Sequence, residues 1–328
     1  MMLSRRAFVA AAAGAALPRA AGAAAGLRIG ALKFGTLTWL VETIEAEGLA
    51  AREGLAIERV DYASGQATTV ALQAGDVDLI VSDWLWAMRL RGEGEDFRFA
   101  PFSNALGALM VGADGPVKTL ADLKGRKLGV AGGALDKSWL LLRAYGLSVL
   151  GGDLKELAEP VYGAPPLVGE QLMLGRIDAA LTFWPFAARL EARGCRRLID
   201  MNEVVAGLGI APPPPLVGHV WRERTYAAKR PQIEAFFRAA QGANAVLKGT
   251  DARADAAWAR LRPLMQAGDE AEFAALRRYF IAGIPAGFGP AEIAACDQLY
   301  GLLAKLGGPD LVGPKPGFDP ALFWSRQA

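Results

Sequence analysis

Apolar and polar residues alternate along the first part of the chain in short strand-like runs and longer helical stretches. "LRIGAL" (27–32), "LAIERVDYAS" (55–64) and "DVDLIVS" (76–82) have the length and apolar character of strands. Between them, "TWLVETIEAEGLAAREG" and "QATTVALQAG" repeat apolar residues at helical spacing. Strands that alternate with helices predict βαβ units, and therefore a parallel sheet covered by helices.

A second series with the same alternation follows a separate strand pattern at 105–115. Its strands are "KLGVAG", "EPVYG" and "IDAALT", and its helices are "KSWLLLRAYG" and "PLVGEQLMLG". After residue 205 the alternation stops. A four-proline run leads into the strand "PLVGHVW", and the remaining helical patterns cover 230–248, 252–265, 269–282 and 290–306.

The two series repeat each other at an offset of 100 residues. "GDVDLIVSDWLWAMRL" begins at residue 75 and "GRIDAALTFWPFAARL" at residue 175. At this offset six residues coincide: Trp39 and Trp139, Tyr62 and Tyr162, Leu72 and Leu172, Gly75 and Gly175, Asp78 and Asp178, and Trp84 and Trp184. The repeat predicts an α/β fold of two similar lobes.

The order of these patterns also predicts how the lobes are joined. The strands near 106–112 and 216–221 flank the second series, and we expect them to be the crossover strands. Lobe one would then comprise 26–105 plus 217–328, and lobe two 106–216. The C-terminal helices are expected to pack on lobe one as a helical extension.

Residues 1–25 have the pattern of an export signal. Arg5 and Arg6 precede an apolar stretch, and small residues follow around 21–25. The pair in "SRRAFV" resembles a twin-arginine signal, and an ordinary secretory signal is the alternative. Either route predicts a periplasmic protein with the signal cleaved. Its loss removes three arginines and no acid, which takes the formal charge from +2 to −1.

Composition excludes several other classes of protein. Apolar residues make up 52% and charged residues 21%, which is typical of a globular protein with a large core. A formal charge of +2 does not suggest nucleic acid as a partner, because that partner requires a clustered basic face. Cys195 and Cys296 could pair in an oxidising compartment or stay as two buried thiols. Their spacing matches no metal site or redox pair, so we expect no metal and no cofactor.

Candidate binding residues follow the predicted strands. Ligands of parallel sheets bind beyond the carboxyl ends of the strands, where helix N-termini present unpaired N–H groups. There the chain carries hydroxyls, amides, small residues and aromatic rings. The predicted ligand-binding residues are Lys33, Phe34, Thr36, Thr38, Trp39, Ser64, Gly65, Gln66, Ser82, Asp83, Trp84, Gly133, Asp136, Ser138, Phe183 and Trp184.

Several of these residues have a second interpretation. Each tryptophan at a strand-to-helix junction could pack in the core instead of stacking on a ligand. Asp83, which replaces Phe183 in the repeat, could read the ligand or cap the next helix. Lys33 could face an anionic ligand or only solvent. His219, the single histidine, is interpreted as structural, and Asp78 and Asp178 as turn residues instead of a catalytic pair.

Two segments of the chain resemble a known family. "TLADLKGRKLGVAGG" (119–133) looks like the segment that opens the second lobe of type II periplasmic solute-binding proteins. "LQAGDVDLIVSDW" resembles the matching first-lobe segment of their nitrate/sulfonate/taurine branch, which includes thiamine-pyrimidine binders. The resemblance implies two lobes that close around a small solute and deliver it to an ABC permease and ATPase. "FGTLTW" departs from the first loop of some sulfonate binders, which puts a simple sulfonate in question.

Three functions are compatible with these patterns. The first is a non-enzymatic, monomeric binding protein that captures a sulfonate, a taurine-like compound or a flat aromatic or heterocyclic solute by hinge closure. The second is a periplasmic sensor or docking protein on the same fold. The third is an enzyme of the thiamine-pyrimidine-synthesis type, which one histidine and no cysteine cluster argue against.

Overall fold

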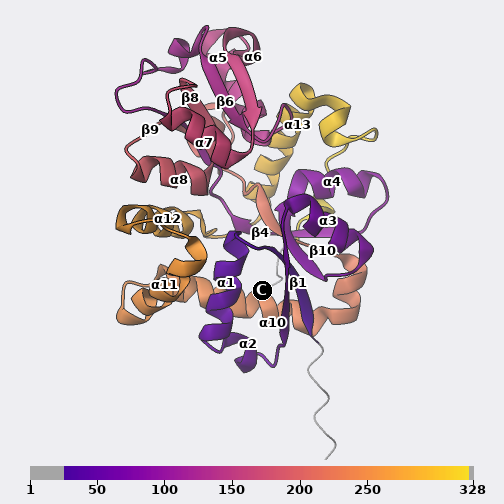
Figure 1. Cartoon of the computed structure of the whole chain (residues 1–328). Coiled ribbons are helices and arrows are strands. Elements are labelled where there is room, and N and C mark those ends of the chain that lie inside the picture. Colours follow the sequence, from indigo (N-terminus) through magenta and orange to yellow (C-terminus); the bar gives the residue numbers. More distant parts are fainter. Residues whose placement is uncertain (1–25, 325–328) are drawn as a thin grey trace, which may run out of the picture.

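Two five-stranded sheets form the centres of two α/β lobes (Figure 1). A computed structural model of the protein describes residues 26–324. The first sheet has the order β2-β1-β3-β10-β4 and consists of β1 (Leu27–Leu32), β2 (Ile57–Tyr62), β3 (Leu79–Asp83), β4 (Phe97–Ser103) and β10 (Val217–Arg222). The second has the order β7-β6-β8-β5-β9 and consists of β5 (Gly107–Val111), β6 (Lys127–Ala131), β7 (Glu159–Gly163), β8 (Ala179–Phe183) and β9 (Arg196–Asp200).

Helices cover both sheets and continue beyond them. Between the strands of the first sheet lie α1 (Thr36–Ala46), α2 (Leu49–Arg52), α3 (Gly65–Ala74) and α4 (Trp84–Gly92). The second sheet carries α5 (Lys137–Leu150), α6 (Leu154–Leu157), α7 (Pro165–Met173), α8 (Trp184–Ala192) and α9 (Met201–Gly207). The C-terminal part is formed by α10 (Glu223–Lys248), α11 (Ala252–Met265), α12 (Glu270–Gly283) and α13 (Pro290–Val312).

The predicted fold of two similar lobes is confirmed, with the same spatial arrangement of strands in each. In both sheets, three parallel strands are followed by one antiparallel strand, β10 in the first sheet and β5 in the second. An edge strand, β4 or β9, pairs with it in turn. The sequence patterns did not predict these two edge strands, because "FRFAPFS" is interrupted by proline and "RRLID" is short and charged.

The chain passes between the lobes twice, in segments 104–106 and 208–216. Each strand predicted as a crossover follows such a segment and is embedded in a sheet, β5 in the second and β10 in the first. The segment before β5 is attached to the C-terminal helices, because the Asn104 N–H donates to the carbonyl of Gly283 (2.8 Å). The lobe limits drawn from the sequence remain a prediction.

The repeat holds in space at the ends of α3 and α7 and for the third strand of each lobe, and it shifts at the first and second strands. Trp84 and Trp184 begin equivalent helices, and each backbone N–H donates to a leucine carbonyl just before the antiparallel strand. The offset of 100 is wrong for the second strand. Gly30 and Gly129 hold equivalent places, and their partners are Val60 and Val161, an offset of 101. Tyr62 therefore does not correspond to the tyrosine at 162.

The C-terminal helices pack on lobe one and also reach lobe two. Helices α10 and α11 pack against α1, as expected for an extension of lobe one. Helix α12 packs on α8, and α13 packs on both α4 and α5, so these two helices bridge the lobes (Figure 1). The apolar clusters explain this arrangement, because Phe280 of α12 lies in one core with Trp184, and Leu303 of α13 in another with Trp139.

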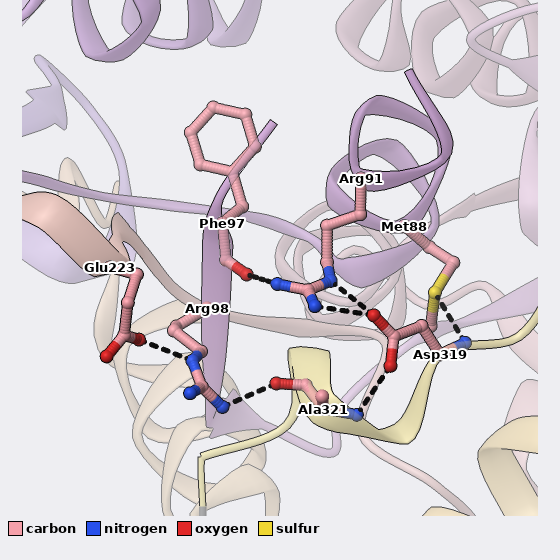
Figure 2. A network of polar contacts seen from close by, with 7 residues as sticks. All are labelled: Met88, Arg91, Phe97, Arg98, Glu223, Asp319 and Ala321. Carbon is pink, nitrogen blue, oxygen red and sulfur yellow. Dashed lines mark hydrogen bonds and ion pairs between the residues drawn. The ribbon is translucent and has the colours of Figure 1, made fainter. Parts of the chain in front are cut away.

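The last described segment is attached to lobe one by a polar network (Figure 2). The Arg91 guanidinium donates to Asp319 through Nε (2.9 Å) and Nη2 (2.5 Å), and Arg98 donates to the carbonyl of Ala321. The Trp324 N–H donates to the carbonyl of Phe99 (2.8 Å), which extends the edge of the first sheet. The end of the chain thereby covers the edge strand β4.

Candidate functional site: a cleft between two lobes

Two cavities lie between the lobes, at the ends of the parallel strands. The first, which we call the apolar cavity, has a volume of about 510 Å³. The second, which we call the polar cavity, has a volume of about 570 Å³. Residues of both lobes line each of them. A space of this size, shared by two lobes, is typical of a site for a small molecule.

The β1–α1 loop forms one wall of the apolar cavity. Gly35 caps α1 without a side-chain hydrogen bond, so the first N–H groups of the helix are available to an acceptor. Thr36 lines the cavity at this point, together with Thr68 of α3. Phe34, which is 64% exposed, lies in the lining, and its ring is therefore open to a ligand or to solvent. This wall combines hydrogen-bonding groups with an aromatic rim.

The β8–α8 junction forms the opposite wall. Phe183 ends β8 and precedes α8, whose first turn contains Pro185 and Phe186. Pro185 has no N–H to satisfy, and proline fits the first turn of a helix. These three residues line the apolar cavity, and Pro166 of α7 lies beside them. Lobe two therefore contributes mainly apolar surface.

Arg189 is the one charged residue among the described residues that line the apolar cavity. Its guanidinium donates to the carbonyls of Met265 (2.6 Å) and Gln266 (3.2 Å), and it forms an ion pair with Glu272 of α12. Burial lowers the pKa of Arg189. The Arg189 guanidinium on α8 is thus bound by groups of the C-terminal helices, where α12 packs on α8.

An ion pair crosses between the lobes at the polar cavity. The Lys137 ammonium, at the start of α5, donates to Oδ2 of Asp83 (2.9 Å). The other oxygen of Asp83 accepts the N–H of Trp86 (2.9 Å), so Asp83 is also the N-cap of α4. Both residues line the cavity, together with Gln66 and Ser82. Asp83 therefore caps a helix, as one interpretation held, and at the same time faces the cleft.

The N-cap of α5 is an unusual carboxylate. Asp136 accepts the N–H groups of Ser138 (2.9 Å) and Trp139 (3.2 Å). Burial raises the pKa of Asp136 to about 6, although Lys137 and the two N–H groups act in the opposite direction. Burial lowers the pKa of Lys137, but the negative charges of Asp83 and Asp136 outweigh this effect, so the Lys137 pKa is raised. Lys137 therefore stays charged at neutral pH.

Two of the three predicted tryptophans, Trp84 and Trp184, and the counterpart of Trp39 in the repeat, Trp139, pack in the core and do not line a cavity. Trp84 is fully buried, and its indole N–H donates to the carbonyl of Pro215 (3.0 Å). Trp139 is fully buried in α5, and Trp184 is 8% exposed. Trp39 lines the apolar cavity, and its ring packs edge to face on Trp184 at 6.1 Å; Trp86, which was not among the predicted ligand-binding residues, lines the polar cavity. Trp84 and Trp184 belong to neither lining, so the structure favours the core-packing interpretation for both rings.

The structure divides the other predicted residues between the two cavities. Phe34, Thr36 and Phe183 join Trp39 at the apolar cavity, and Gly65, Gln66, Ser82 and Asp83 line the polar one. The rest lie outside both linings. Thr38 is buried and donates to the Gly35 carbonyl, Ser64 and Asp136 cap helices, and Ser138 is buried. Gly133 and Lys33 also lie outside, and Lys33 lies 5.6 Å above the Phe34 ring.

Sequence reasoning missed Pro166, Arg189, Val217 and Gln266 in the apolar cavity. Val217 opens the antiparallel strand, and Gln266 ends α11, so neither follows a parallel strand. Arg189 lies more than one helical turn beyond the β8–α8 junction. Lys137 was also missed, although it adjoins the predicted Asp136. Its helix-start position on lobe two, opposite an unmatched Asp83 on lobe one, is the signal that could have found it.

The residues interpreted as structural have structural contacts. Asp78 accepts the Arg28 N–H and the Lys229 ammonium, and Asp178 accepts the Lys127 N–H. His219 is 4% exposed among three phenylalanine rings, and burial lowers its pKa to about 3. Cys195 and Cys296 are both free and buried, so they do not pair. In residues 26–324 there is no metal-binding group of histidine, cysteine and carboxylate side chains, and no helix is long and apolar enough to cross a membrane.

Two α/β lobes around a shared cleft define the class of two-lobed, periplasmic-binding-protein-like folds. The family comparison agrees with this class. The model of the NMT1/THI5-like family matches residues 45–252, which is more than half of the chain, and the protein belongs to that family. Among curated proteins, no sequence matches the chain.

Three solved structures share the fold and are distant in sequence, with identities of 15–20%. The alkanesulfonate-binding protein SsuA from Xanthomonas axonopodis pv. citri, bound to MOPS, matches with a TM-score of 0.68 and 20% identity, over 92% of this chain and 98% of that one. The periplasmic aliphatic sulphonate binding protein SsuA from Escherichia coli matches with a TM-score of 0.69 and 20% identity, over 89% and 94%. The desulfurization enzyme DSZB matches with a TM-score of 0.61 and 15% identity, over 89% and 94%.

Proposed function

We propose that the protein is the solute-binding component of an ABC importer and acts as a monomer in the periplasm after cleavage of its export signal. The observation that carries the proposal is a cavity of about 510 Å³ with walls from both lobes. A solute in that cavity touches both lobes, and its binding therefore favours the closed arrangement. The likeness to two sulfonate-binding SsuA proteins supports this function. The export signal lies outside the described residues.

The chemistry of the cleft favours binding over catalysis. The likeness to DSZB and the NMT1/THI5-like family raise the question of an enzyme. Nucleophilic catalysis needs an activated nucleophile, commonly a side chain that lies beside a base. Among the described residues, neither cysteine nor His219 belongs to the lining of the two cavities. Burial also raises the pKa of the Cys296 and Cys195 thiols, which disfavours the reactive thiolate.

A ligand screen on the mature protein tests the proposal. Sulfonates, taurine, nitrate, pyrimidines and aromatic acids are screened by thermal shift, because a ligand that binds the folded state raises the unfolding temperature. Phe186→Ala removes an aromatic ring from the lining of the apolar cavity and should weaken the binding of any hit. Leu147→Ala removes an exposed side chain outside the lining and serves as the control.

Small-angle scattering then shows whether a hit closes the lobes. A binding protein should become more compact with the hit, and the Leu147→Ala control should behave like the wild type. If no compound shifts the unfolding temperature, or if a hit is turned over into product, the proposed function is wrong. A sensor on the same fold would bind and close as well; genes for an ATPase and a permease beside this one would favour the importer.

A further inference from the structure

The cations that line the cleft are already paired with carboxylates of the protein. In the apolar cavity, Arg189 is paired with Glu272 and donates to two carbonyls of the α11 C-terminus. Glu272 is itself fixed in place, because its second oxygen accepts the Gly268 N–H (3.0 Å). The guanidinium therefore has a full negative charge beside it before any solute enters.

The cations that line the polar cavity are also paired with carboxylates. Lys137 is paired with Asp83 at 2.9 Å, and Arg89 with Glu93 at 3.7 Å. Asp310 of α13 adds a further carboxylate to this lining. Lys33, the lysine predicted as a counter-charge, is exposed and lies outside the linings of both cavities. Each cation among the described lining residues is thus paired with a carboxylate, although Glu272 itself lies outside the lining of the apolar cavity.

An anionic solute would gain little in such a site. It loses its hydration on entry, and the N-terminus of α1 restores only part of that loss to an anion, so full compensation needs a free cation. Here the solute would compete with Glu272 or Asp83 for the cation. Aromatic and aliphatic side chains make up most of the apolar cavity: Phe34, Trp39, Phe183, Pro185, Phe186 and Val217. Their contribution grows with the apolar area of the solute and does not depend on its charge.

The remaining polar groups suit a neutral acceptor. The N-terminus of α1 offers N–H groups that no side chain caps, and Thr36 offers a hydroxyl, whereas the Thr68 hydroxyl already donates to the Gly65 carbonyl (2.7 Å). A carbonyl, sulfonyl or amide oxygen can accept from these donors without carrying a net charge. We propose that the cleft selects an uncharged solute with a flat or bulky apolar body and a hydrogen-bond-accepting head, in preference to a sulfonate. This inference rests on the proposed function, since it concerns the solute of the same cleft.

A pair of compounds that differ mainly in charge tests the inference. Naphthalene-2-sulfonamide and naphthalene-2-sulfonate have the same rings and similar heads, but only the sulfonate is charged at neutral pH. Isothermal calorimetry on the mature wild-type protein should give the sulfonamide at least a tenfold lower Kd. Equal affinity, or tighter binding of the sulfonate, would overturn the inference and leave the proposed function standing with an anionic solute.

Two matched variants test the physical cause. Glu272→Gln releases the charge of Arg189 and keeps an oxygen for the Gly268 N–H, so sulfonate binding should tighten about tenfold. Glu270→Gln makes the same change of charge on the same helix, but Glu270 is paired with Arg262 and lies outside the linings. It should leave both affinities unchanged. An unchanged sulfonate affinity in Glu272→Gln would show that the Arg189–Glu272 ion pair is not the cause of weak sulfonate binding. If that variant does not fold, the comparison of the two naphthalene compounds on the wild-type protein still decides the solute class.

The absence of binding by both naphthalene compounds distinguishes failure of this inference from failure of the proposed function. If neither compound binds, the inference as stated is wrong, because the apolar body and neutral head fail to give affinity. The thermal-shift screen then decides on the function: a hit of another class keeps the binding protein, and no hit removes both proposals.

Discussion

Trp39 of lobe one and Trp184 of lobe two meet edge to face across the cleft, with ring centroids 6.1 Å apart and ring planes at 87°. Both rings also contact Phe280 of α12, so one aromatic cluster joins two lobes and a C-terminal helix. Edge-to-face pairs contribute about 0.5–1.5 kcal/mol beyond the area that they bury. The cluster therefore stabilises the contact between the two lobes in this arrangement.

Trp184→Ala should lower the free energy of unfolding by about 3 kcal/mol, because a large ring that is 8% exposed is lost from this cluster. Trp184→Phe keeps an aromatic edge and should cost less than half as much. Chemical denaturation followed by circular dichroism measures both. A loss below about 1 kcal/mol for the alanine variant would mean that the lobes are held together by other contacts.

The sequence predicted the two lobes because hydrophobic periodicity and the internal repeat are local signals. It predicted the segments that line the two cavities for the same reason: Thr36, Gln66, Asp83 and Phe183 all lie at or just beyond the ends of parallel strands. It could not tell a buried tryptophan from an exposed one, because Trp84 is covered by Pro215, Phe318 and Phe323, which lie far along the chain. Arg189 and Gln266 were missed for a similar reason, since only the packing of α12 on α8 brings them to the cavity.

His219 should make the protein sensitive to acid. Burial lowers its pKa from 6.5 to about 3, so the unfolded state takes up a proton that the folded state rejects. Stability contributed by this group is present above pH 6.5 and is lost as the pH falls towards 3. His219→Phe, placed among Phe102, Phe236 and Phe237, removes the proton uptake. The difference in unfolding free energy between variant and wild type should therefore grow between pH 6.5 and 4. A constant difference would show that the imidazole does not resist protonation.

Asp136 should act in the opposite direction. Its pKa is raised from 3.8 to about 6, so the folded state holds a proton more tightly than the unfolded state does. The stabilisation is full below pH 3.8 and is lost as the pH rises through 6, by up to about 3 kcal/mol. Asp136→Asn keeps a capping oxygen for Ser138 and Trp139 and does not titrate. Relative to wild type, the variant should gain stability between pH 4 and 7 in denaturation experiments. If the two curves run parallel, burial does not shift this carboxyl.

The ion pair between Asp83 and Lys137 should bias the lobes towards closure. Both side chains are less than a third exposed, so the pair is worth more than a surface pair and still only about 1 kcal/mol. Asp83→Asn keeps an oxygen to cap α4 through the Trp86 N–H and removes only the charge. Lys137→Met removes the charge from the other lobe and keeps the length of the chain. Each variant without solute should have a larger radius of gyration in small-angle scattering, and the double variant should be no larger than either single one. If the expansions of the two single variants add up in the double variant, the two charges act separately. If no variant expands, the aromatic cluster and the contact between α8 and α12 hold the lobes together without this ion pair.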